Sequence, residues 1–214
     1  MSVADGALRE GILYDLIGRL TDEDSRLRTV RAMAARYHAD PLQAGRVAAT
    51  ASVLFQQVCD DWDLAAPHQQ LLGWAAQLHE LGLDIAHAHY HRHGAYVLEN
   101  ADMPGFPREE QLVLARLVLG HRRGFERESF RDLPPEWQRS AFRMALLLRL
   151  AALFHRSRSD KALPDLRLQV HGRSMDLQLP AAWLANNPLT LADLERERAF
   201  LVAADCKLTI RPRS

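Results

Sequence analysis

The sequence predicts a mainly α-helical chain that ends in a small α+β part. Apolar residues recur at helical spacing up to about residue 158, in segments bounded by helix-capping residues. After Pro164 the pattern changes to an alternation of apolar and polar residues, which is typical of β-strands. We therefore expect a helical domain at about 21–160 and a small α+β domain at about 163–214, with residues 1–20 as a leading linker segment.

Capping residues mark where the predicted helices begin. Asp40 is a typical N-cap residue, and Pro41 is typical of a first helical position. The segment after them runs to about Asp60 and has an apolar face made up of Val47, Ala51, Leu54, Phe55 and Val58. Gly82 is predicted to be the C-cap of the next helix. The same signals predict further helices from about 21, at 67–82, at 92–99, from 107 and at 136–158.

The tail is predicted to contain a β-hairpin, two helices and a third strand. Leu166, Leu168 and Val170 alternate with polar residues, and so do Met175, Leu177 and Leu179. The turn-forming residues 171–174 lie between the two runs, so we expect the runs to pair. Helices are expected at 181–186 and 191–203, and a strand at 207–210.

Composition narrows the class of protein. The chain has 214 residues, of which 48% are hydrophobic, and its 27 basic side chains balance 27 acidic ones. A net charge of zero argues against a general nucleic-acid binder, and we expect no specific nucleic-acid partner. The longest apolar stretch is too short to span a membrane. Cys59 and Cys206 form no CxxC pair, which favours a reducing compartment, and we expect a cytoplasmic protein.

Several histidines near the ends of predicted helices are candidate metal ligands. His79 and Glu80 are adjacent near the end of one predicted helix, and His121 ends another. His38 and His91 are further candidate ligands from neighbouring segments. Imidazole nitrogens with a carboxylate suit Zn, Mn, Fe or a similar ion, which would activate water for attack on phosphorus. A single histidine in such a place is more often a capping or surface residue.

Several of these stretches resemble the HD superfamily of metal-dependent phosphohydrolases. More closely, the chain resembles the C-terminal region of the exopolyphosphatase and guanosine pentaphosphate phosphohydrolase family. The resembling stretches are Gly6–Leu16, Arg36–His38, Trp74–Gly82, His91–Tyr96, Asn100–Phe106 and His121–Arg123. The resemblance implies an HD-like helical domain, a small α+β terminal domain and a homodimer. It also implies that residues 1–20 correspond to the end of an N-terminal phosphatase domain.

The resemblance further implies that chemistry lies outside this chain. In the family the phosphatase chemistry belongs to an N-terminal actin-like domain with Gly-rich phosphate loops, and no such loop precedes Gly6 here. We therefore expect no catalytic residues and no hydrolysis of polyphosphate by the family's usual mechanism. The HD pattern is also degraded, since Glu80 replaces an aspartate and Ala152 stands where the final aspartate is expected. We expect no tightly bound cofactor, with Mn²⁺ or Mg²⁺ as candidate ions if a metal binds at His38, His79, Glu80, His91 and His121.

The function expected from the sequence is phosphate binding. Residues 108–161 hold 12 basic and 7 acidic side chains, and a basic groove would hold polyphosphate or a phosphorylated nucleotide by counterion release. The predicted phosphate-binding residues are Arg122, Arg123, Arg156 and Arg158. Two alternatives stay open: an active HD phosphohydrolase acting on a nucleotide such as guanosine tetra- or pentaphosphate, and an interaction module without a ligand. Metal content separates the first alternative from the main prediction.

Overall fold

The helices begin close to where the capping residues predict. The computed structural model describes residues 25–213, so the segment 1–20 and the predicted start of the first helix at about 21 lie outside the described residues. Helix α3 (Pro41–Val58) has Asp40 as its N-cap, and the Asp40 carboxylate accepts from the backbone N–H groups of Leu42 and Gln43. Every residue predicted for the apolar face of this helix is buried.

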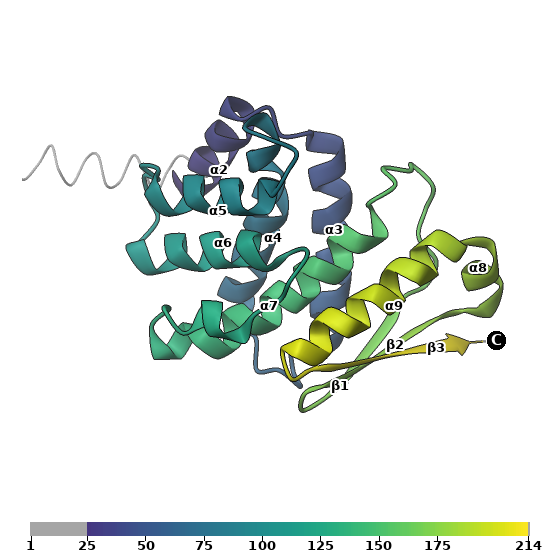
Figure 1. The fold of residues 1–214 in the computed structure, drawn as a ribbon. Helices are drawn as coiled ribbons and strands as arrows, with labels where there is room; N and C mark the ends of the chain where they lie inside the picture. The colour runs from purple at the N-terminus through teal and green to yellow at the C-terminus, as the bar shows by residue number, and fades with distance from the viewer. Residues whose placement is uncertain (1–24, 214) are drawn as a thin grey trace, which may run out of the picture.

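The other elements of the helical part form a bundle in which α7 packs against α3, α4 and α6, and α5 packs against α6 (Figure 1). They are α2 (Ser25–Arg36), α4 (Ala66–Leu78), η1 (Leu81–Asp84), α5 (Tyr90–Asn100), α6 (Arg108–Gly120), η2 (Arg127–Phe130) and α7 (Pro135–Phe154). The predicted C-cap at Gly82 is wrong, because α4 ends at Leu78 and His79 is its C-cap. Helix α7 ends four residues earlier than predicted, and Arg158 beyond it adopts a left-handed backbone with φ 54°.

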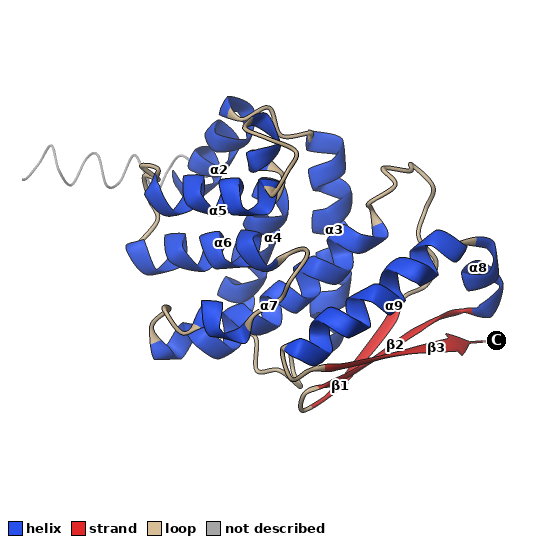
Figure 2. Cartoon of the chain, viewed as in Figure 1, coloured by secondary structure: helices blue, strands red, loops and turns tan. Residues whose placement is uncertain are grey.

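The tail folds as the predicted hairpin followed by a crossover (Figure 2). Strands β1 (Arg167–His171) and β2 (Ser174–Pro180) pair antiparallel, and β3 (Lys207–Arg213) pairs parallel to β2. Helices α8 (Ala181–Asn186) and α9 (Pro188–Ala203) connect β2 to β3. The fold class is therefore confirmed: the chain is mainly helical, with a small three-stranded sheet ordered β1-β2-β3.

The helical part and the tail share one hydrophobic core. A single cluster of buried side chains includes Leu54 and Leu147 of the helices and Leu168 and Leu177 of the sheet. The Gln57 side chain on α3 accepts from the backbone N–H of Leu168, at 2.6 Å, and donates to the carbonyl of Leu166, at 2.8 Å. These contacts place the sheet against α3, and the domain boundary near residue 160 stays a prediction from the sequence.

Among the described residues, we find no helix that is both long enough and apolar enough to cross a membrane.

Candidate functional site

A cavity of about 220 Å³ lies where α4, α6 and α7 come together with the loop that precedes α5. It is lined by many of the residues that the sequence singles out. These are His79, Glu80, His121, Arg122, Ala152, Arg156 and Arg158. Residues far apart in the sequence, such as Glu80 and Ala152, therefore lie around one cavity.

The two cavity histidines are buried and held in one orientation. His79 and His121 are the C-caps of α4 and α6, and each is 2% exposed. Nδ1 of His79 lies 2.7 Å from the carbonyl oxygen of Ala76, and Nδ1 of His121 lies 2.6 Å from that of Val118. A carbonyl oxygen only accepts, so each Nδ1 donates and the lone pair of the neutral ring is on Nε2. The two rings meet edge-to-face with centroids 5.3 Å apart.

Burial keeps these imidazoles neutral. Burial lowers the pKa of His79 despite the nearby Glu80 carboxylate. The pKa of His121 is lowered further, first by burial and then by the neighbouring His79. The Tyr90 hydroxyl lies 3.4 Å from Nε2 of His121, the geometry of a weak donated hydrogen bond. A neutral imidazole with its Nδ1–H on a carbonyl has the form of a metal ligand, but it is also the form of an ordinary helix cap.

Arg158 binds the Glu80 carboxylate, which lines the cavity. Its Nη2 lies 2.8 Å from each of the two Glu80 oxygens, and its Nη1 lies 2.8 Å from Oδ2 of Asp40. The Glu80 side chain is 11% exposed, so this ion pair is largely desolvated. The guanidinium thus supplies the positive charge that a metal ion would otherwise bring to Glu80.

The donor set around the cavity does not fit a metal ion. Ala152 brings no ligand atom to the cavity, and Glu80 already binds Arg158. Within residues 25–213 no group of three or more His, Cys, Asp or Glu side chains is arranged to hold a metal. Two imidazoles alone give a poor coordination shell.

His38 and His91, the other predicted ligands, do not line this cavity. The His38 side chain is 79% exposed, and its Nδ1 pairs with Oδ1 of Asp84 at 2.9 Å. His91 is 5% exposed, and its ring centroid lies 6.3 Å from that of His121. Burial, followed by the charge of Arg122, lowers the pKa of His91 to about 4. The structure therefore brings His79, Glu80 and His121 to the cavity, whereas His91 lies near His121 without lining the cavity and His38 pairs with Asp84 elsewhere.

Of the four predicted phosphate-binding arginines, two form ion pairs with carboxylates and two do not, among the residues that the structure describes. Arg156 pairs with Asp193 at 2.6 Å, and Arg158 with Asp40 and Glu80. Arg122 lies over the Tyr90 ring, 4.5 Å from its centroid. Arg123 is exposed and does not line the cavity. Neither Arg122 nor Arg123 forms an ion pair with a carboxylate that the structure describes.

Sequence reasoning missed two further features. The first is a buried pair, in which Arg149 on α7 binds Glu197 on α9. The second is a cavity of about 520 Å³ lined by five arginines, namely Arg127, Arg131, Arg139, Arg143 and Arg173. The basic excess of residues 108–161 was a signal for this cavity, since four of the five arginines lie there.

Fold and cavities define the chain as a mainly helical protein with one arginine-rich cavity and a second cavity that contains a histidine–carboxylate cluster. Residues 25–198 match the family described as Ppx/GppA phosphatase, domain III. The chain is also 37% identical, over 198 residues, to a guanosine-5'-triphosphate,3'-diphosphate pyrophosphatase of Pseudoalteromonas translucida (strain TAC 125). That alignment covers 92% of this chain and 40% of the relative. The chain belongs to the Ppx/GppA phosphatase family and corresponds to its C-terminal region.

Proposed function

We propose that this C-terminal portion binds inorganic polyphosphate and carries out no phosphoryl chemistry of its own. The observation that carries the proposal is the contact between Arg158 and Glu80, with both carboxylate oxygens 2.8 Å from one guanidinium nitrogen. An HD-like site that has exchanged a metal for an arginine cannot activate water as a metal does, but it keeps cationic groups beside a cavity.

Binding would begin at the arginines that are not already neutralised. Arg122 lines the cavity and Arg123 is its exposed neighbour in the chain, and neither has a carboxylate partner among the described residues. Arg156 and Arg158 would have to share their charge with Asp193, Asp40 and Glu80. The polyphosphate chain would therefore be held weakly and with strong dependence on salt.

The alternative is an active HD phosphohydrolase acting on a guanosine tetra- or pentaphosphate. One observation favours it: the Nε2 lone pairs of His79 and His121 belong to neutral rings at a shared cavity. The relative's name also specifies a guanosine nucleotide as its substrate. This reading needs Mn²⁺ or Mg²⁺ bound without a carboxylate at position 152.

The test compares polyphosphate binding and hydrolysis by the same protein. In a calorimetric titration with polyphosphate of defined length, the affinity should fall as the salt concentration is raised from about 50 to about 200 mM. The double variant Arg122→Gln with Arg123→Gln should weaken binding and flatten this salt dependence. Arg36→Gln, an exposed arginine at the end of α2 that lines neither cavity, should change neither.

Activity decides between the two functions. We expect no release of phosphate from polyphosphate or from guanosine pentaphosphate, with or without Mn²⁺. Turnover at about 1 s⁻¹ or more that survives repurification and scales with protein concentration would overturn the binding proposal. If the double variant binds polyphosphate with the affinity of wild type, polyphosphate binds at another surface.

Assembly and location complete the proposal. We propose a homodimer, as the resemblance to the family implies, and multi-angle light scattering would contradict it by giving the mass of one chain, 24.2 kDa. Both cysteines are free thiols, Cys206 buried and Cys59 partly so, which supports the proposed cytoplasmic setting.

A further inference from the structure

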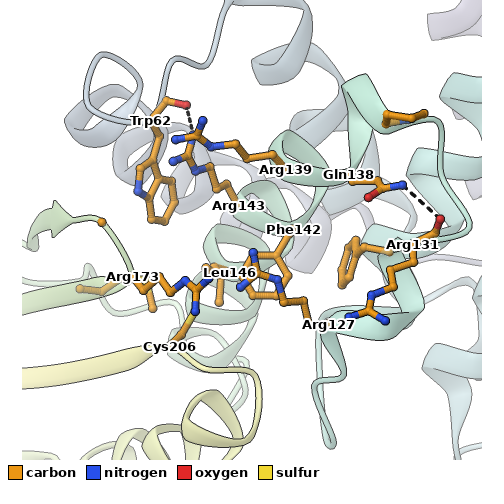
Figure 3. A pocket seen from close by; sticks show the side chains of 14 residues that line it. Trp62, Arg127, Arg131, Gln138, Arg139, Phe142, Arg143, Leu146, Arg173 and Cys206 are labelled. Atoms are coloured by element: carbon orange, nitrogen blue, oxygen red, sulfur yellow. Dashed lines mark hydrogen bonds between the residues drawn. The ribbon is translucent and has the colours of Figure 1, made fainter.

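The larger cavity lies at the junction of the helical part and the sheet. Arg127 comes from η2 and Arg139 and Arg143 come from the first half of α7, whereas Arg173 lies in the β1–β2 turn and Cys206 precedes β3 (Figure 3). Its volume of about 520 Å³ is within the range of about 300–1,000 Å³ that is usual for small-molecule sites. It shares no lining residue with the cavity at Glu80. The two are separate sites.

All the charged side chains that line this cavity are positive. Its lining includes five arginines and no aspartate or glutamate. Within residues 25–213, Arg127, Arg139 and Arg143 form no ion pair with a carboxylate. Arg131 pairs with Glu128 at 3.5 Å, and Arg173 pairs with Asp205. Burial and the neighbouring Arg139 lower the pKa of Arg143, and the charge of Asp63 opposes this in part. Cations that line one cavity without enough carboxylate partners are stabilised by a polyvalent anion.

The other half of the lining is apolar. It consists of Trp62, Phe130, Pro135, Phe142, Leu146, Met175 and Cys206. Two of the guanidinium groups lie over aromatic rings, Arg143 at 5.6 Å from the Trp62 centroid and Arg127 at 5.1 Å from that of Phe142. Planar guanidinium groups held in this way present flat faces on which a planar ring can stack.

We propose that this cavity is a binding site for a nucleoside polyphosphate. The arginines would hold the phosphate chain, and the apolar part of the lining with its stacked guanidinium planes would receive the base. A bare phosphate chain would leave the apolar half unused, whereas an uncharged ring would leave the arginines unpaired. The ligand would contact α7 and the β1–β2 turn together, and would thereby stabilise the packing of the sheet against the helices.

GTP is the probe for this site. Tripolyphosphate and guanosine are the comparison ligands, because each represents one half of GTP. By isothermal titration the 214-residue chain should bind one GTP, and should bind tripolyphosphate and guanosine each at least tenfold more weakly. The double variant Arg127→Gln with Arg139→Gln should lose at least tenfold in GTP affinity. Both side chains are exposed, so the variant should fold, which a thermal melt checks. Arg36→Gln serves as the matched control.

Three results would overturn the proposal. The first is the absence of saturable GTP binding. The second is GTP binding outside this cavity, shown when the Arg127→Gln with Arg139→Gln variant binds GTP as wild type does; a loss of binding in Arg122→Gln with Arg123→Gln would then place the nucleotide at the Glu80 cavity. The third is tripolyphosphate binding as tightly as GTP, which would mean that the base has no site. Because Arg122 and Arg123 line no part of the larger cavity, failure here is distinguishable from failure of the polyphosphate proposal.

Discussion

Arg158 joins Glu80 to Asp40, with one guanidinium nitrogen on each carboxylate group, although the three residues lie on separate segments. Asp40 is also the N-cap of α3, and its pKa is lowered first by the hydrogen bond from the Gln43 backbone. One arginine therefore connects the start of α3 to the end of α4. The backbone at Arg158 itself is left-handed, with φ 54°.

The first prediction is that oxygen ligands can be returned to the cavity. The double change Glu80→Asp with Ala152→Asp should raise Mn²⁺ affinity at least tenfold, because the shorter carboxylate withdraws from Arg158 and a second carboxylate joins it. Wild type should lack a tightly held metal. Electron paramagnetic resonance of free Mn²⁺ measures the affinity.

The matched control is Glu80→Asp with Ala152→Asn, which has the same side-chain size without the charge. Affinity in the double aspartate variant should fall at low pH, because the imidazole ligands must be neutral. Wild-type protein that copurifies with one metal per chain would contradict this prediction, and so would a double variant that binds no better than wild type.

The second prediction concerns the pair between Arg149 and Glu197. The Arg149 side chain is 1% exposed, its Nε lies 2.5 Å from Glu197, and its terminal nitrogens donate to the carbonyls of Gly120 and Arg123. Glu197→Gln should lower the free energy of unfolding by about 3–5 kcal/mol, because it leaves a buried guanidinium without a counter-charge.

Urea denaturation measures this loss, and an exposed pair on the same helix is its control. Glu195 pairs with Arg198 at 2.5 Å with both side chains 48% exposed, so Glu195→Gln should cost less than about 1 kcal/mol. Equal effects of the two substitutions would show that burial does not set the energy of the Arg149 pair.

Elements specified by local signals were predictable from the sequence. Asp40 followed by Pro41 begins α3, and the alternation on both sides of residues 171–174 predicts the β1–β2 hairpin, although not its register. The end of α7 was not predictable from local signals, and Arg158, placed inside the predicted helix, instead binds carboxylates 78 and 118 residues earlier in the chain. The parallel pairing of β3 with β2 was likewise not part of the prediction.

The candidate site was predictable only in part. Adjacent His79 and Glu80 and the position of Ala152 pointed to one place, and all three line one cavity with His121. The sequence pattern did not predict the partners of these side chains: Glu80 binds Arg158, and His38 binds Asp84 outside the cavity. The basic excess of residues 108–161 includes four of the five arginines of the larger cavity, but it did not indicate that they meet Arg173 of the β1–β2 turn.

The third prediction is that Gly82 is required for the close approach of α5 to η1. A Cβ at Gly82 would lie well under 3.0 Å from the backbone carbonyl oxygen of Tyr90. Gly82→Ala should therefore be destabilising by several kcal/mol, because backbone must move. Gly73→Ala on α4 is the control: its Cβ meets nothing within 4 Å, and it should stabilise the helix by up to about 1 kcal/mol. A Gly82→Ala melting temperature equal to that of wild type would refute the packing argument.

The last prediction is that stability falls as the pH is lowered through the histidine range. The pKa values of His79, His91 and His121 are lowered in the folded protein, each first by burial. The unfolded chain, with histidine pKa values of about 6.5, therefore binds more protons than the folded chain below that pH. The stabilisation is complete above about pH 6.5 and is lost as the pH falls, for His91 until about pH 4.

Urea denaturation between pH 7.5 and 5.0 measures this dependence. His91 alone should contribute a loss of up to about 2 kcal/mol over that range, at about 1.4 kcal/mol per pH unit below 6.5. His91→Asn should remove this contribution and make the free energy of unfolding less dependent on pH, because the variant has no group to protonate there. His171→Asn, at an exposed position on β1, should leave the pH dependence as in wild type. If the two variants show the same slope against pH, the protons are taken up elsewhere and the buried imidazoles are not the groups that destabilise the fold in acid.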